Sequence, residues 1–370
     1  MIFKDAVSPR RRTALIRKAY RNTPLISTIA IIIFLVYCFR VQLHQFIDYA
    51  RQTNPWSGQR QIEQAFTPTD TELACFHGSS TNQTDAIPNV VRFIYIFTEP
   101  LARKHGIQFD FINYLAIRSA IVSLKPDAIY LHYAFISPSG STIKSKFDPT
   151  SNPWIRRLRN DIHLVQHTIE NPYGQPIPHI ADVMRLQILR DNGGIYLDTD
   201  SFALKPFTSI LNPPRPHDVV LGYEGGNRWG MCNAVIAARK NSTFIHDWLN
   251  EYMTGKPHRE WNYRSVLFPK ELADRKPDDV CALSPSAFFW PTWTWGHVTW
   301  MHEPLSEKEV KYWEGEIERN GGALFDGQLA YHAWNQMAAT RYLDGLSPEV
   351  VRTKDTRFNL LMRRFLEHDL

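Results

Sequence analysis

The segment from residue 180 to residue 200 constrains the fold of this chain more than any other, because it predicts a helix, a turn and a strand in order. Its first half places apolar residues at the spacing of one helix face: Ile180, Val183, Met184 and Ile188. Asn192-Gly193 follows, and glycine ends a helix in the left-handed region at the least cost. Ile195-Tyr196-Leu197 is short and apolar, as a buried strand would be. Asp198 and Asp200 therefore follow the carboxyl end of a predicted strand.

Alternating strand and helix patterns precede this segment. Runs of β-branched and aromatic residues at 90–97, 128–133 and 162–165 predict strands. Helical patterns lie between them, at 109–124 and around 154–159. Strand, helix and strand in alternation is typical of a parallel sheet with crossover helices. We therefore expect an α/β domain with a mostly parallel sheet and flanking helices.

The pair Asp198 and Asp200 suggests a metal site. Alternate residues of an extended chain point the same way, so the two carboxylates can meet at one point. The carboxyl edge of a parallel sheet is where α/β folds bind ligands. A divalent ion there would take carboxylate and diphosphate oxygens, and would stabilise the charge on a departing nucleoside diphosphate. A bare Asp-x-Asp also fits a solvated turn, but the preceding helix, Gly-Gly turn and strand favour the metal site.

With these flanking residues the chain resembles the DXD-motif sugar-binding glycosyltransferases of family 32. The resemblance is carried by Ala181-Asp182-x-x-Arg185, by residues 193–200 and by Leu204-Lys205-Pro206-Phe207, with Ile87-Pro88 similar to the start of the family. It is close over 178–208 and looser over 87–335. The family includes initiating α-1,6-mannosyltransferase, inositol-phosphoceramide mannosyltransferases and α-1,4-galactosyl and N-acetylglucosaminyl transferases. The resemblance implies a GT-A-like fold, a UDP- or GDP-hexose donor with Mn²⁺ or another divalent cation, and retention of anomeric configuration.

Four residues of this segment match positions of the family's donor site. Asp198 and Asp200 match the metal-binding, catalytic motif, and Asp182 and Arg185 match helix positions that line the nucleotide-sugar pocket. The alternative for Asp182 and Arg185 is a salt bridge between residues i and i+3 on an exposed helix face. No carboxylate is identified as a covalent nucleophile. A front-face mechanism without a nucleophile is therefore an equal alternative to a covalent intermediate.

Later residues supply further candidates. Asn233, in a predicted strand after the loop at 222–227, is a candidate for a polar contact to the sugar. His332 lies in Tyr331-His332-Ala333-Trp334-Asn335, which resembles a late element of the family. We expect it to be a third, catalytic metal ligand or a diphosphate contact, with a structural histidine as the alternative. An aromatic cluster between them suits either the core or an acceptor platform: Phe288, Phe289, Trp290, Trp293, Trp295 and Trp300.

The amino-terminal region predicts membrane topology. The net charge of +5 is concentrated before residue 24, which leaves the remaining chain nearly neutral and argues against nucleic-acid binding. An uncharged stretch at 25–39 is at the short limit for spanning a bilayer, and the basic residues before it favour a cytoplasmic amino terminus. A cleaved signal peptide is the alternative, but no small-x-small cleavage site follows. We expect a single-pass type II protein of the Golgi membrane.

This topology defines five regions. We expect a cytoplasmic tail at 1–23, a signal-anchor helix at 24–41, a stem at 42–87, a GT-A-like catalytic domain at 88–345 and an amphipathic carboxyl-terminal helix at 346–370. Asn82 and Asn241 begin glycosylation sequons, which suit a lumenal domain. The lumenal part has three cysteines, Cys75, Cys232 and Cys281, so at most one disulfide joins two of them.

These observations predict a metal-dependent, retaining hexosyltransferase that acts on a hydroxyl of a glycan or glycolipid. A phosphatase of the haloacid-dehalogenase type also has Asp-x-Asp after a buried strand. It needs that motif near the start of its domain, with Thr or Val where this chain has Phe202. The remaining alternative is a catalytically inactive, GT-A-like lumenal protein that binds carbohydrate.

Overall fold

The structure is a computed structural model of the 370-residue chain. It describes residues 27–40, 68–75, 86–98, 108–136, 148–169, 176–212, 217–256, 258 and 260–370. The chain divides into two compact units, residues 1–57 and 58–370, and each is described by itself.

The first unit includes the predicted anchor. Residues 27–38 are helical, and their apolar side chains, Ile31, Ile33 and Phe34 among them, are exposed. Across the described parts of the chain, no helix combines the length and the apolar character needed to cross a membrane. The predicted tail at 1–23 lies outside the described residues, as does most of the predicted stem.

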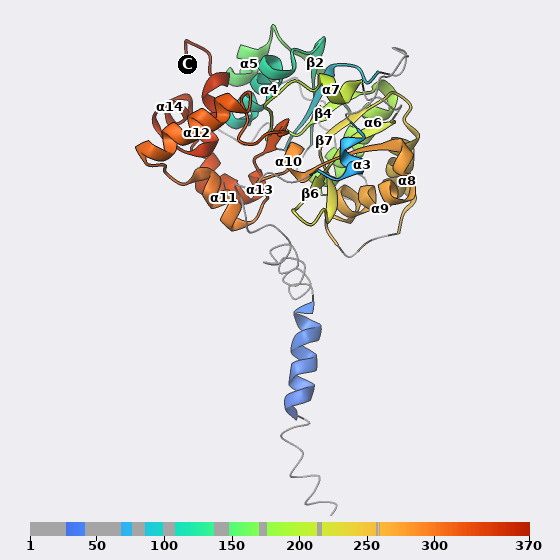
Figure 1. The fold of residues 1–370 in the computed structure, drawn as a ribbon. Helices are drawn as coiled ribbons and strands as arrows, with labels where there is room; N and C mark the ends of the chain where they lie inside the picture. Colours follow the sequence, from blue (N-terminus) through green and yellow to red (C-terminus); the bar gives the residue numbers. More distant parts are fainter. Residues whose placement is uncertain are drawn as a thin grey trace, which may run out of the picture. The chain divides into compact units, whose positions relative to one another are not determined.

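The second unit, with its strands drawn as arrows in Figure 1, is built on a sheet with the strand order β3-β2-β1-β4-β7-β6-β8. Its strands are β1 (Val90–Phe97), β2 (Ala128–Phe135), β3 (His163–Gln166), β4 (Gly194–Leu197), β6 (Val219–Glu224), β7 (Gly230–Ala238) and β8 (Val280–Leu283). The first four run parallel, β7 runs antiparallel to both of its neighbours, and β8 runs parallel to β6. The predicted mostly parallel sheet is thus confirmed.

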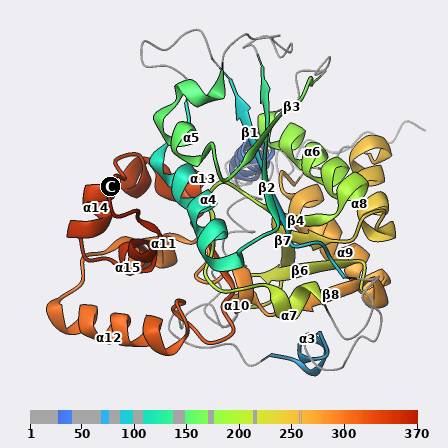
Figure 2. The same cartoon turned by 90° about the horizontal axis from the view of Figure 1, so that it is seen from above.

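Helices cover both faces of the sheet (Figure 2). One face packs against α6 (Ile177–Asn192), α8 (Thr243–Thr254) and α9 (Phe268–Arg275). The other packs against α4 (Phe111–Leu124), α5 (Pro153–Leu158) and most of the carboxyl-terminal part. Neighbouring residues on β1 face opposite cores, Phe93 one and Ile94 the other, as expected for strands that are buried on both sides.

The remaining elements are short or lie toward the carboxyl terminus. They are α3 (Asp70–Leu73), β5 (Ser201–Ala203), α7 (Thr208–Leu211), α10 (Pro285–Phe288), α11 (Trp295–His302), α12 (Glu307–Arg319), β9 (Ala330–His332), α13 (Asn335–Ala338), α14 (Pro348–Thr353) and α15 (Arg357–Met362). Strands β5 and β9 pair as a separate two-stranded sheet. That small sheet is important because it begins directly after the Asp-x-Asp motif.

The turn between α6 and β4 needs both of its glycines. Gly193 and Gly194 have φ angles of +66° and +105°, which L-residues with a Cβ rarely adopt. A Cβ at Gly193 would lie 2.7 Å from the backbone nitrogen of Lys240, and one at Gly194 would lie 2.5 Å from the carbonyl oxygen of Val90. Glycine therefore lets the helix end, β1 and the end of β7 approach closely.

The predicted single helix at 346–370 is wrong, because α14, α15 and a 3-10 turn (Arg363–Phe365) occupy this region instead. The break has a local cause. Thr356 caps α15 by accepting a hydrogen bond from the N–H of Asn359, and the Asn359 side chain donates to the carbonyl oxygens of Val350 and Lys354. Of the apolar residues at helical spacing in this region, Phe358, Leu361, Met362 and Phe365 are nevertheless fully buried, whereas Leu366 is only partly buried.

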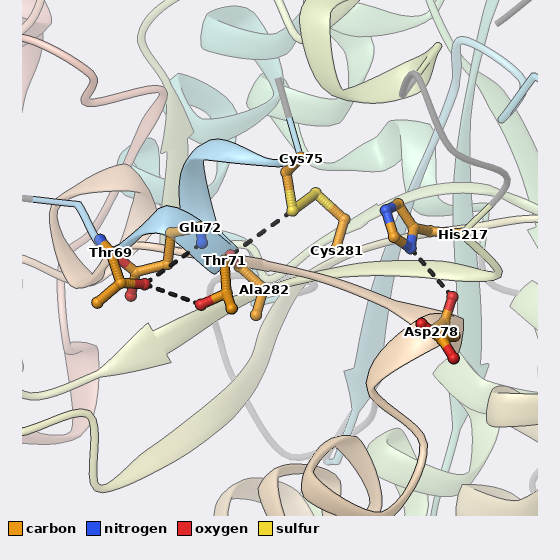
Figure 3. The surroundings of a disulfide bond; sticks show 8 residues. All are labelled: Thr69, Thr71, Glu72, Cys75, His217, Asp278, Cys281 and Ala282. Atoms are coloured by element: carbon orange, nitrogen blue, oxygen red, sulfur yellow. Dashed lines mark hydrogen bonds between the residues drawn. A yellow bond between two sulfur atoms is a disulfide. The ribbon is translucent and has the colours of Figure 1, made fainter. Parts of the chain in front are cut away.

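A disulfide joins Cys75, just after α3, to Cys281 in β8 (Figure 3). Glu72 of α3 also forms an ion pair with Arg228, with 2.9 Å between Arg228 Nη2 and Glu72 Oε2. Residues 68–75 were predicted to belong to the stem, but the disulfide and the ion pair attach them to the sheet and loops of the second unit. Of the other cysteines, Cys232 is buried and Cys38 exposed, and both are free thiols.

Candidate metal centre

Asp198 and Asp200 lie in a tight turn between β4 and β5. The N–H of Asp198 donates to the carbonyl of Ala234 on β7, and the N–H of Ser201 donates to the carbonyl of Asp198, each at 2.9 Å. The two carboxylates converge, as predicted from the sequence. The sequence analysis attributed this convergence to an extended chain, which was wrong, because a turn brings the two carboxylates together.

Pairing of β5 with β9 brings His332 to the same point. Ser201 and His332 are opposite each other in this pair, and His332 Nε2 lies 3.2 Å from Asp200 Oδ1. The N–H of Asn335 donates to Asp200 Oδ2 at 2.9 Å, which fixes the carboxylate. One ligand atom from each of Asp198, Asp200 and His332 lies within 4.8 Å of the others.

The donor set of this centre fits a divalent cation such as Mn²⁺. Two carboxylates and an imidazole are ligands that such ions accept. Among the described residues, His332 Nδ1 is buried and has no hydrogen-bond partner, so the ring has coordinating capacity left. The side chains of Asp198 and Asp200 are 25% and 13% exposed to solvent, which leaves access for an ion.

The electrostatics of the three groups are consistent with a site for a cation. Burial raises the pKa of Asp198, and the Asp200 charge adds to that effect while Arg185 opposes it. Burial acts in the same direction on Asp200, but His332 and the Asn335 N–H hold its pKa below the usual value. Burial acts to lower the pKa of His332, yet the two carboxylates raise it above its ordinary value. The two carboxylates therefore favour a positive charge at this point of the structure.

Arg185 of α6 supports this centre from the side. Its Nη1 lies 3.0 Å from Asp198 Oδ1 and donates to the carbonyl of Asn233 at 2.7 Å. Its Nη2 lies 3.1 Å from Asp182 Oδ1. The predicted alternative of an i, i+3 salt bridge is therefore present, but the pair is buried rather than exposed and extends to the metal-site carboxylate. The Tyr196 hydroxyl donates to the same Asp198 oxygen at 2.5 Å, and the Arg185 guanidinium lies over the Tyr196 ring.

Asp182 holds the far end of this network. It accepts a hydrogen bond from Asn233 Nδ2 at 2.7 Å and another from the Tyr252 hydroxyl at 2.9 Å. The side-chain nitrogen of Asn233 is therefore engaged by Asp182, and its contact to a sugar stays a prediction. The sequence analysis assigned no site role to Tyr196 or Tyr252. Tyr196 was counted as an apolar residue of a buried strand, and Tyr252 lies far from the motif in the sequence, on α8.

Sequence reasoning also missed Glu224, a buried carboxyl at the end of β6. It accepts a hydrogen bond from Trp293 Nε1 at 3.1 Å. Burial raises the pKa of Glu224 to about 7, although His332 and hydrogen bonds from Cys232 and Trp293 act to lower it. The segment Gly222-Tyr223-Glu224-Gly225-Gly226 was predicted to belong to a loop, whereas Glu224 ends strand β6 and is buried, so its sequence context gave no signal.

The aromatic cluster near this site is mostly core. Phe288, Phe289, Trp290 and Trp300 are buried, whereas Trp295 is 45% exposed. The rings of Phe289 and Trp334 meet the His332 ring edge-on. The aromatic residues around His332 therefore fix the orientation of its ring.

Comparison with known proteins gives concordant matches. Residues 113–218 match the family model described as glycosyltransferase sugar-binding region containing DXD motif. This span includes Asp182, Arg185, Asp198 and Asp200, and it ends before Glu224 and His332.

Individual relatives extend the match beyond that span. A Cryptococcus neoformans var. grubii protein named glucan organizing enzyme 1 is 34% identical over 292 residues, which is 76% of this chain and 71% of that protein. The lactosylceramide 4-alpha-galactosyltransferase of Mus musculus is 23% identical over 201 residues, which is 50% of this chain and 48% of that enzyme. The Rattus norvegicus enzyme of the same name is 24% identical over 207 residues, 52% of this chain and 50% of its own length.

Proposed function

The chain belongs to the family 32 type of glycosyltransferases with a DXD sugar-binding region, and on that premise we propose what this hexosyltransferase transfers and how. It moves a hexose from a UDP- or GDP-sugar to a hydroxyl of a glycan or glycolipid, with Mn²⁺ or another divalent cation at Asp198, Asp200 and His332. The convergence of these three ligand groups within 4.8 Å carries the proposal.

The residues of the centre have distinct parts in this proposal. A divalent cation supplies Lewis-acid stabilisation of the charge on the departing nucleoside diphosphate. Arg185 and Tyr196 both contact Oδ1 of Asp198, so Oδ2 would be the oxygen available to hold an ion. Asp200 is oriented by the Asn335 N–H and by His332. Asp182 holds Arg185 and Asn233 in place, so Asp182 and Arg185 act as positioning residues for the ligands and as the wall of the donor pocket.

Retention of configuration belongs to the proposal as well. It requires either a carboxylate nucleophile or departure and attack on the same face of the sugar. Glu224 is the buried carboxyl that interacts electrostatically with His332, and it is the residue to test first for the nucleophile.

We also propose that the chain is a type II protein of the Golgi membrane, anchored at 24–41, with the domain from 88 to 345 in the lumen. The Cys75–Cys281 disulfide supports an oxidising compartment. Asn241 is exposed, as a glycan acceptor must be, whereas Asn82 lies outside the described residues. Protease protection of sealed microsomes and a glycosidase-sensitive mobility shift test this topology.

The activity is tested by nucleoside diphosphate release. Purified full-length chain is incubated with a panel of UDP- and GDP-hexoses, with and without glycan and glycolipid acceptors, in Mn²⁺ or in excess chelator. We expect release from one donor class that depends on the cation and is increased by the correct acceptor. Binding of a donor with no release under any condition would instead favour the inactive carbohydrate-binding protein.

A further inference from the structure

A cavity lies beside α6, on the face of the sheet that α6 covers. It has a volume of about 590 Å³ and is formed by β1, β2, the end of β3 and the second half of α6. Asp198, Asp200 and His332 do not line it. Its polar lining includes Arg92, His132, His167, Arg190 and Asp191.

Arg92 gives this cavity a positive charge without a counter-ion. The residue is 7% exposed, its Nε donates to the carbonyl of Gly193 at 2.9 Å, and its guanidinium lies over the Tyr130 ring. Among the described residues no carboxylate pairs with it, whereas Arg190 is bound by Asp191 through contacts of 2.6 and 3.1 Å. Arginine remains protonated in proteins, and a buried charge is costly unless it is paired. The lining therefore keeps one uncompensated positive charge.

His132 adds a second unsatisfied group. It is 5% exposed, and its Nδ1 lies 2.9 Å from His167 Nε2. Within the described part of the chain, its Nε2 is buried and has no hydrogen-bond partner. Burial lowers the pKa of His132 to about 3, with His167 and Arg92 adding to the effect, so the ring is neutral near pH 7. If His167 Nε2–H donates to His132 Nδ1, the proton of His132 lies on Nε2, which is then a free donor.

We propose that this cavity binds a small organic molecule carrying an oxyanion, a phosphate or a carboxylate, with Arg92 and His132 as its hydrogen-bond donors. An oxyanion supplies the missing counter-ion of Arg92 and selects the tautomer with a proton on His132 Nε2. The volume lies in the range of small-molecule sites and exceeds the need of a bare anion. Tyr130, Met184 and Ile188 give the remainder of the lining an apolar part. The site does not depend on the proposed transferase activity.

Phosphate and acetate are the probes that test this site, and chloride at matched ionic strength is the reference. Thermal unfolding of the full-length chain is followed after protein and buffers have been freed of metal on a chelating resin, which withholds the cation from the metal centre without adding a soluble carboxylate. A specific ligand stabilises the folded state by mass action, whereas phosphate also stabilises proteins non-specifically. We expect a saturable rise of the melting temperature in phosphate or acetate over chloride.

The variants separate the specific effect from the general one. Arg92→Met is expected to abolish the saturable rise of the melting temperature. His132→Phe keeps the Arg92 contacts and an aromatic ring. It is expected to weaken anion binding roughly tenfold or more, the typical effect of losing a hydrogen bond to a charged group. Asp191→Asn, which removes a negative charge from the lining, is expected to bind at least as tightly. As a second measurement, a saturable shift of the His132 ring resonance in phosphate, assigned by its loss in His132→Phe, supports the site. An equal rise in all variants, or no anion effect on that resonance, would overturn the proposal.

Discussion

The two charged regions beside α6 differ in how their buried charges are paired. The helix contributes Asp182 and Arg185 to a buried network that ends at the three candidate metal ligands. Its carboxyl-terminal residues help to line a cavity in which no carboxylate of the described residues pairs with Arg92. Each buried charge near the metal centre has several partners, whereas Arg92 has one carbonyl and one ring. The paired charges therefore preorganise the metal centre, whereas the uncompensated charge of Arg92 is available to a ligand.

The largest expected effect comes from removing a metal ligand. Asp200→Asn keeps the side-chain size but loses the charge, so we expect hexose transfer to fall roughly thousandfold, because Lewis-acid stabilisation is worth several kcal/mol and about 1.4 kcal/mol is a factor of ten. Initial rates of nucleoside diphosphate release measure the loss, and circular dichroism checks that the variant folds. Undiminished transfer by a folded variant would remove the metal centre from the mechanism.

The second test compares two arginines of α6. Arg185→Met leaves Asp182 and Asp198 buried without their partner, so we expect a loss of about 3–5 kcal/mol in the free energy of unfolding. Arg190→Met, its matched control, breaks a partly exposed pair and should cost about 1 kcal/mol or less. Denaturant unfolding in chelator measures both. Equal losses in the two variants would contradict the network described for Arg185.

The third test concerns Glu224 and pH. Its pKa in the folded protein, about 7, lies above the value of 4.5 for an unburied glutamate, so the folded state favours the protonated form. Its contribution to stability is fully present below pH 4.5 and is lost as pH rises through 7, by about 3 kcal/mol.

Replacing Glu224 by Gln, which is neutral throughout, isolates that contribution. We expect the free energy of unfolding of Glu224→Gln, measured in chelator at a series of pH values, to lose this part of its pH dependence between 4.5 and 7. The same pH dependence in the variant and the wild type would show that Glu224 ionises without cost. A transfer rate that survives in Glu224→Gln would exclude it as the nucleophile.

A small effect is also expected for Arg92. Without an anion, Arg92→Met removes an uncompensated charge together with one hydrogen bond to Gly193, so the free energy of unfolding should fall by only about 1 kcal/mol. The value is measured in chloride, beside that of Arg185→Met. A loss as large as that of Arg185→Met would mean that Arg92 is part of a completed network, and the contrast between the two regions would disappear.

Local patterns were sufficient to predict the elements that lead to the site. The strand predicted at 90–97 is β1, the strand at 195–197 is all but the first residue of β4, and the helix before it is α6. These elements have strong local signals: periodic apolar residues, β-branched runs and glycines at a turn that admits no side chain. Asp198 and Asp200 were found because they directly follow the predicted helix, turn and strand.

The rest of the site depends on pairing between distant segments, which local patterns do not encode. His332 reaches Asp200 through the pairing of β5 with β9, and Tyr252 reaches Asp182 from α8. Glu224 is distinguished by burial rather than by its sequence context. In the sequence, Arg92 is one polar residue within a strand. Its burial beside α6 is evident only from the structure. The break between α14 and α15 depends on side-chain caps at Thr356 and Asn359, which a pattern of apolar residues does not show.

Binding of the donor together with Mn²⁺ tests the central claim most directly. Thermal unfolding of the full-length chain is measured with a panel of UDP- and GDP-sugars, with Mn²⁺ or with chelator, for the wild type and Asp200→Asn. We predict that one nucleotide class stabilises the wild type by about 2.7 kcal/mol at a hundredfold excess over its dissociation constant, only with Mn²⁺ present, and that Asp200→Asn shows no such shift. Stabilisation that persists in chelator or in Asp200→Asn, or none with any donor, would contradict a metal-bound donor at Asp198, Asp200 and His332.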